Sequence, residues 1–260
     1  MNNAGNSPGI YPDPVGKGLG GMKIALIGYG KMGKTIEAIA LERGHTVDLK
    51  IDIDSLGSFT KENLAQCDVA IEFTGPHSAK ENILKCLDAG IPTVSGSTGW
   101  LQDWPEAEKI CNEKNGSFLY ASNFSVGVNI FFEVNKKLAQ LMKGRNEYTI
   151  RLQEIHHTQK KDAPSGTAIT LAEQILQEIP EKKKWVNYET GNAAELAIIS
   201  KREDPAPGTH SITYSSAIDD IEIIHTAHNR NGFALGAVLA AEYICNKKGI
   251  FSMKDVLGLS

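Results

Sequence analysis

The sequence has few cysteines, no long apolar run and no excess of basic residues, and each shortage excludes a class of protein. Its four cysteines form no CxxC pair, which argues against a disulfide scaffold or zinc knuckle and favours a reducing, cytoplasmic compartment. The most apolar stretch, residues 232–245, contains Glu242 and falls short of the roughly 20 residues that span a membrane. Lys and Arg number 27 against 31 Asp and Glu, so no basic field indicates nucleic acid or a membrane as partner. An anionic ligand must therefore be bound by a local cluster.

The 260 residues are enough for one large or two modest domains, and their apolar share of 41% is that of a globular chain. Residues 1–21 are rich in Gly, Pro and Asn, and they lack the basic start and apolar core of a signal peptide. We expect this stretch to be a leader, disordered or tag-derived, that takes no part in the fold.

From residue 22 onward, short apolar runs alternate with helical segments. Runs of this kind are typical of strands buried on both faces, and repeated βα units imply parallel strands joined by right-handed crossovers. The pattern predicts a doubly wound α/β domain. Its expected strands are residues 24–27, 46–51, 68–73, 91–94 and 118–121.

The second part of the chain has a different periodicity. Amphipathic helices are expected over residues 128–142 and 168–179, while 147–156 and several runs between 186 and 226 alternate as half-exposed strands do. We therefore expect an α+β domain with a mostly antiparallel sheet. A final helix over 233–245 is rich in Ala and Gly, which suits close packing against a sheet.

A glycine-rich turn lies between the first strand and the first helix. Gly28, Gly30 and Gly33 form G-x-G-x-x-G, a turn that lets the backbone approach a pyrophosphate at a helix N-terminus. Asp52 ends the second strand 19 residues after Gly33, where an acid can bind the ribose hydroxyls. A purely structural turn with a surface Asp is the alternative.

The residues around Asp52 bear on the choice of nucleotide. Ile53 follows it where an arginine could neutralise a 2′-phosphate, and the carboxylate itself would repel that phosphate. This favours NADH, although Lys34 and Lys50 leave NADPH open.

The densest group of reactive side chains lies in residues 154–167. His156, His157 and Lys160 leave a strand and precede a helix that begins near Pro164, whose N-terminus can bind an anion. A histidine in this position titrates near neutral pH and can donate a proton. The segment predicts an anion-binding pocket with a proton donor.

Three other readings of this segment remain. Adjacent histidines in a strand point to opposite faces and no third ligand has a recognisable spacing, so a metal site is disfavoured. Ser165 follows a proline and lacks a nucleophile elbow, which disfavours a catalytic triad. A structural turn with surface histidines is the third.

The segment E-I-H-H-T-Q-K-K-D-A-P-S-G-T-A closely resembles the signature of the dihydrodipicolinate reductase family. Further matches are G-S-T-G at 96–99, N-F-S-V-G-V-N at 123–129, G-T-H at 208–210 and R-x-x-F-A-x-G at 230–236. The resemblance extends from residue 22 to the end. It departs from the family at Ser122, where a proline is usual, and in residues 199–207, which lack the family's glycine-rich motif.

The resemblance implies a Rossmann-like cofactor domain, residues 22–126 plus 231–260, closed by the returning C-terminal helix. Residues 127–230 would bind substrate, and their sheet would build a homotetramer. The implied reaction is NADH- or NADPH-dependent reduction of 4-hydroxy-tetrahydrodipicolinate to tetrahydrodipicolinate in lysine and diaminopimelate biosynthesis, with hydride delivered to C4 of this small dicarboxylate.

The resemblance also implies roles for individual residues and no metal. His156 would be the proton donor, with Lys160 a second candidate acid. The substrate would contact His157, Ser165, Gly166, Thr167 and Arg230. The nucleotide would contact Gly28, Gly30, Lys31, Met32, Gly33, Asp52, Gly96, Ser97, Thr98, Ala121, Ser122, Asn123 and Phe124.

Two rival functions are a reductase of another small acid and a non-catalytic NADH sensor. A pocket without groups that bind carboxylates would favour the first. The sensor has no need of two histidines and a lysine beside a helix N-terminus, and no basic helix for DNA is present.

Overall fold

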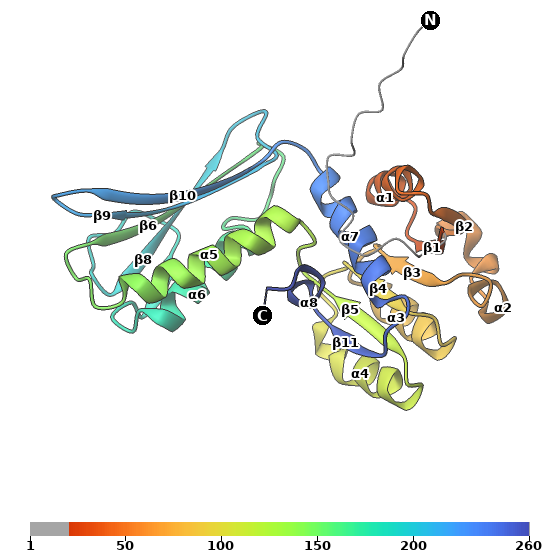
Figure 1. Ribbon diagram of the computed structural model, residues 1–260. Coiled ribbons are helices and arrows are strands. Elements are labelled where there is room, and N and C mark those ends of the chain that lie inside the picture. The colour runs from red at the N-terminus through yellow and green to blue at the C-terminus, as the bar shows by residue number, and fades with distance from the viewer. Residues whose placement is uncertain (1–20, 260) are drawn as a thin grey trace, which may run out of the picture.

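The computed structural model describes residues 21–259, in which two β-sheets each carry their own helices (Figure 1). The expected leader, apart from its last residue, lies outside the described residues. No helix in the described part of the chain is long and apolar enough to cross a membrane.

The first sheet is parallel throughout, with the strand order β11-β5-β4-β3-β1-β2, and it bears out the doubly wound prediction. Five of its strands were expected, and the C-terminal β11 adds a sixth. The strands are β1 (Lys23–Ile27), β2 (Thr46–Ile51), β3 (Val69–Glu72), β4 (Thr93–Ser95), β5 (Ser117–Tyr120) and β11 (Gly249–Phe251). The helices around it are α1 (Lys31–Glu42), α2 (Lys61–Leu64), α3 (Ala79–Asp88), α4 (Trp104–Glu113), α7 (Asn231–Ile244) and α8 (Met253–Leu257), with 3₁₀ turns η1 (Ile53–Ser58) and η2 (Leu101–Asp103).

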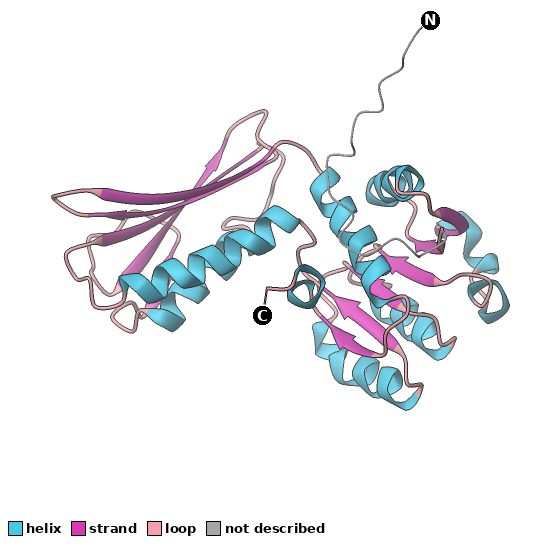
Figure 2. Ribbon diagram, in the orientation of Figure 1, coloured by secondary structure: helices cyan, strands magenta, loops and turns pink. Residues whose placement is uncertain are grey.

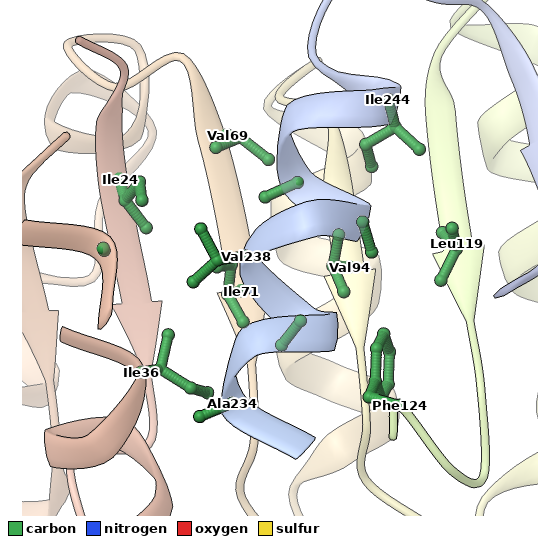
Figure 3. Packing of buried hydrophobic residues seen from close by; sticks show 14 of the residues in the cluster. Ile24, Ile36, Val69, Ile71, Val94, Leu119, Phe124, Ala234, Val238 and Ile244 are labelled. Carbon is green, nitrogen blue, oxygen red and sulfur yellow. The ribbon is translucent and has the colours of Figure 1, made fainter. Parts of the chain in front are cut away.

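Helix α7 returns from the second sheet and packs into the core of the first. Figure 3 shows Val238 and Ile244 on this helix beside apolar side chains of the strands. Small residues let the helix come close: a Cβ on Gly236 would lie 1.7 Å from the carbonyl oxygen of Phe124. Glu242, the charge in this apolar run, is paired with Arg43 at 2.7 Å and His45 at 2.8 Å.

The second sheet is mixed, with the order β10-β9-β6-β8-β7. Strand β9 is antiparallel to β6 and β10, whereas β8 is parallel to β6 and β7, so parallel pairing is more frequent than expected. Two returns across the sheet make these pairs parallel: α6 carries the chain back between β6 and β7, and residues 187–194 carry it back between β7 and β8. Helices α5 and α6 cover one face, and no helix among residues 21–259 covers the other (Figure 2). The elements are α5 (Val126–Met142), β6 (Thr149–His156), α6 (Gly166–Glu178), β7 (Lys184–Val186), β8 (Glu195–Arg202), β9 (Gly208–Ser215) and β10 (Asp220–Ala227).

Candidate active site

The glycine-rich turn forms a backbone cradle at the start of α1. Gly28 has φ +97°, and a Cβ there would lie 2.1 Å from the carbonyl oxygen of Phe73. A Cβ on Gly33 would lie 2.3 Å from the carbonyl oxygen of Gly28, so helix and turn pack closely only without side chains. Gly30 caps α1 with open space around it and no side-chain hydrogen bond. The first-turn N–H groups are therefore available to an anion.

Asp52 lies beside this cradle at the carboxyl end of β2. The Gly28 N–H donates to the Ile51 carbonyl at 2.8 Å, which ties the turn to the end of that strand. The Asp52 carboxylate is exposed, and it accepts the Ile53 N–H at 2.9 Å while capping η1. The predicted ribose acid is thus fixed next to the predicted pyrophosphate cradle.

A cavity of about 350 Å³ opens beyond the carboxyl ends of β3, β4 and β5. Seven residues expected to bind nucleotide line it, namely Met32, Gly96, Ser97, Thr98, Ser122, Asn123 and Phe124. The other expected residues, Gly28, Gly30, Lys31, Gly33, Asp52 and Ala121, are outside this lining. Five further lining residues were not predicted from the sequence: Phe73, Thr74, Gly75, Pro76 and Phe233.

A buried carboxylate lies beneath this cavity. Glu72, at the end of β3, is fully buried and accepts hydrogen bonds from the hydroxyls of Ser95 at 2.6 Å and Ser97 at 2.8 Å. It also accepts the N–H of Thr74 at 3.0 Å and the Thr74 hydroxyl. Burial raises the pKa of Glu72, although these hydrogen bonds act to lower it. Glu72 thereby fixes the loops after β3 and β4. In the sequence, the one feature that could have indicated this role is a single acidic residue at the end of an apolar strand.

An aromatic contact shapes the same cavity. The rings of Phe73 and Phe124 lie 5.4 Å apart, and a Cβ on Gly96 would lie 2.2 Å from the Phe73 ring. Gly96 is therefore needed for the ring to lie against the loop after β4.

A second buried carboxylate organises the 154–167 segment. Glu154 is fully buried on the helix-covered face of β6, and the Ser165 N–H donates to both its oxygens at 3.1 Å. Arg202 donates to Oε1 at 3.3 Å. The Nδ1 of His156 and the Nε2 of His210 lie 3.4 and 3.7 Å from Oε2. Sheet register explains the cluster, because β6 pairs Glu154 directly with His210 on β9.

The two histidines of this cluster are buried and held neutral. Their rings meet edge to face with centroids 5.1 Å apart. Burial lowers the pKa of His156, opposed by the charge of Glu154 and aided by Lys160 and Arg202. Burial likewise lowers the pKa of His210 to about 4. Both rings therefore tend to be uncharged near neutral pH before any anion binds.

The fold brings three candidate metal ligands together, although their spacing in the sequence does not reveal the group. Candidate ligand atoms of Glu154, His156 and His210 all lie within 4.8 Å of one another. However, the carboxylate is already occupied by the Ser165 N–H and the Arg202 guanidinium, and the latter would repel a cation. The Glu154 carboxylate is therefore poorly suited to binding a metal ion.

The predicted substrate residues of the 154–167 segment lie at or before the start of α6, whereas Arg230 directly precedes α7. Gly166 is exposed at its first turn, and the His157 N–H donates to the Ala206 carbonyl at 2.7 Å. The Lys160 ammonium is 2.8 Å from both carboxylate oxygens of Asp162. Arg230 is exposed where α7 begins.

Ser165, also predicted to contact substrate, is buried at the start of α6. Its N–H goes to Glu154, and its hydroxyl accepts the Ala168 N–H at 3.2 Å and lies 3.1 Å from Nε2 of His210. These polar groups are engaged inside the protein, so Ser165 caps α6 and supports the cluster.

The cavity and the 154–167 segment meet at one contact. The amide of Asn123, which lines the cavity, donates to the Thr167 hydroxyl on α6 at 3.4 Å. This contact joins the loop after β5 to the helix start that is available to an anion. The segments predicted to bind nucleotide and substrate therefore touch through these two side chains.

Comparison with known proteins is consistent with this geometry. Residues 22–124 match the family model for the dihydrodipicolinate reductase N-terminus and residues 127–257 that for its C-terminus. A 4-hydroxy-tetrahydrodipicolinate reductase from Christiangramia forsetii is 52% identical over 240 residues, 91% of this chain and 98% of that protein. One from Methanosarcina acetivorans is 36% identical, over 91% of this chain and 89% of that protein.

A solved structure has the same fold. Dipicolinate-bound dihydrodipicolinate reductase from Paenisporosarcina sp. TG-14 superposes with a TM-score of 0.71 at 21% identity. The match covers 89% of this chain and 97% of that one.

Proposed function

The chain belongs to the dihydrodipicolinate reductase family, and on that premise we propose that it reduces 4-hydroxy-tetrahydrodipicolinate to tetrahydrodipicolinate at the site just described. The contact between Asn123 and Thr167 carries this assignment, because it unites a nucleotide cavity with an anion-binding helix start. The reaction serves lysine and diaminopimelate biosynthesis. We infer that residues 22–126 with 231–260 form the nucleotide domain and that 127–230 form the substrate domain.

The residues at the first sheet fit a nicotinamide dinucleotide. The cradle of Gly28, Gly30 and Gly33 would hold the pyrophosphate with Lys31 and Met32, and Asp52 the ribose. The cavity lined by Gly96 to Thr98 and by Ser122 to Phe124, next to Ala121, would hold the nicotinamide end. When bound, NADH or NADPH supplies the hydride, for which we propose C4 of the substrate as the acceptor.

A cyclic dianion requires positive groups on two sides. The free N–H groups of Gly166 and Thr167 at the start of α6 would bind one carboxylate. Lys160 and His157 lie on the loop that leads to this helix, and Arg230 directly precedes α7, three residues before Phe233 of the cavity lining. Ser165 would act through the helix and the glutamate–histidine cluster.

His156 is the group we propose as proton donor. Glu154 lies beside its Nδ1 at 3.4 Å, and its Nε2 faces Gly208, where a Cβ would lie only 3.0 Å away. The lowered pKa of the free enzyme's imidazole means that the proton is acquired mainly when a dianion enters and stabilises the charged ring. Lys160 remains the second candidate acid.

The reductase assignment is tested by following NADH and NADPH absorbance side by side with freshly synthesised 4-hydroxy-tetrahydrodipicolinate. Oxidation of either nucleotide that depends on this substrate supports it, whereas oxidation with a different small acid alone would favour the rival reductase. Nucleotide binding without turnover on any substrate would favour the sensor.

The carboxylate contacts are tested by the double variant Lys160→Gln with Thr167→Val. Losing one charged contact and one hydroxyl should raise the KM for the dicarboxylate by roughly tenfold or more. Lys161→Gln, an exposed neighbour, is the matched control and should leave KM unchanged. An unaffected KM in the double variant would remove these two residues from the substrate site.

The open face of the second sheet supports a homotetramer. Ile224 on β10 is 57% exposed, and sheet register places it on the face that α5 and α6 do not cover. Light scattering should give four times the 28.2 kDa chain mass, and Ile224→Asp should lower it. A monomeric wild-type chain would refute this interface. We place the enzyme in the cytoplasm, where its four free cysteines would stay reduced.

A further inference from the structure

A cluster of charged and aromatic side chains flanks the proposed ribose site. Lys50, near the end of β2, lies 2.5 Å from Oε1 of Glu37 on α1. The hydroxyl of Tyr29, in the glycine turn, donates to the other oxygen of Glu37 and lies 3.4 Å from the Lys50 ammonium. The Lys50 ammonium also lies over the Tyr29 ring, 4.9 Å from its centroid. Three segments that meet at the cradle thus hold one lysine.

The cluster leaves no net positive charge for a phosphate. The hydrogen bond from Lys50 and, to a smaller extent, the one from Tyr29 lower the pKa of Glu37. The same hydrogen bond between Lys50 and Glu37 raises the pKa of Lys50. Both groups are therefore ionised over the working range, and their charges cancel. Asp52, two residues after Lys50, adds a second carboxylate. The charges of Lys50, Glu37 and Asp52 sum to −1, which opposes a dianionic 2′-phosphate.

Lys31 and Lys34 are further cations near the turn, both exposed, and Lys31 is assigned above to the pyrophosphate. The Lys34 ammonium lies 5.9 Å from the centroid of the Tyr29 ring, on the exposed first turn of α1. If Lys34 served the 2′-phosphate, the wild-type chain would bind NADPH at least as tightly as NADH.

We propose that Glu37 is the specificity-determining residue of the nucleotide site: by engaging Lys50 it makes the enzyme selective for NADH over NADPH. The proposal rests on the nucleotide role assigned to this domain above. It needs neither the dicarboxylate nor the proton donor, so it is testable separately from the reaction.

The experiment measures the dissociation constants of NADH and NADPH by titration calorimetry, without dicarboxylate. The wild-type chain should prefer NADH. Glu37→Gln keeps the shape and frees the lysine for the 2′-phosphate, so NADPH should bind roughly tenfold tighter relative to NADH, as one charge-assisted hydrogen bond allows. The double variant Glu37→Gln with Lys50→Gln should lose this gain.

Glu113→Gln is the matched control, because it makes the same charge change in an exposed pair with Lys109 on α4. It should not alter the NADPH-to-NADH ratio. The proposal is overturned if wild type binds NADPH as tightly as NADH, if Glu37→Gln leaves the ratio within twofold, or if the gain survives removal of Lys50. A shifted ratio in a chain that reduces no dicarboxylate would uphold the specificity and refute the reaction. A chain that binds neither nucleotide refutes both.

Discussion

Replacing Glu154 with Gln tests how much the buried carboxylate stabilises the site. The carboxylate accepts one hydrogen bond from the Ser165 N–H, shared between its two oxygens, and one from Arg202, with no exposure to solvent. An amide keeps one neutral acceptor and turns a donor toward Arg202 or the histidines. Charge-assisted bonds contribute about 1.5–3 kcal/mol each and a neutral one about 1, so Glu154→Gln should cost about 2–4 kcal/mol of unfolding free energy.

This cost is measurable by urea unfolding at pH 7 followed by circular dichroism. Glu113→Gln, in an exposed ion pair, is the control and should stay within about 0.5 kcal/mol of wild type. Glu154→Gln should also have a lower turnover rate, because His156 loses the neighbouring negative charge that favours its protonated form. A Glu154→Gln protein as stable and as active as the control would refute the reasoning that this carboxylate supports both α6 and the proton donor.

Three further perturbations test other parts of the site. His156→Gln should lower turnover by roughly 10²–10⁴-fold while leaving NADH affinity nearly unchanged; equal losses in both would point to a structural role. Gly96→Ala should weaken nucleotide binding, because the methyl group meets the Phe73 ring, and calorimetry showing wild-type affinity would contradict this contact. His210, with a folded pKa of about 4 against an ordinary 6.5, binds its proton more weakly than in the unfolded chain. Stability should therefore fall by about 2 kcal/mol from pH 7 to pH 5, and this dependence should shrink in His210→Gln; an equal pH dependence in both proteins would refute it.

Local pattern predicted the glycine cradle well. The three glycines, the strand before them and the acid at the end of β2 are close in sequence, and each has a steric or electrostatic reason to be there. The apolar runs also gave five parallel strands correctly. The sixth strand, residues 249–251, was missed because three residues carry no usable periodicity.

The glutamate–histidine cluster could not be derived from spacing. Glu154 and His210 are far apart in sequence and meet only because β6 and β9 pair in one register. The same tertiary pairing places Glu154 and His210 beside Ser165, whose N–H and hydroxyl contact them. Phe73 and Phe233 enter the cavity wall for a similar reason, since loop and helix contacts are long-range.

The most direct measurement is a crystal structure of the protein with NADH and pyridine-2,6-dicarboxylate, a planar dianionic mimic of the substrate. One carboxylate should accept hydrogen bonds from the N–H groups of Gly166 and Thr167. The His156 ring should lie within reach of the heterocycle, and the nicotinamide should lie in the cavity beside Asn123. A dicarboxylate bound away from the start of α6, with His156 facing neither ligand, would contradict the account.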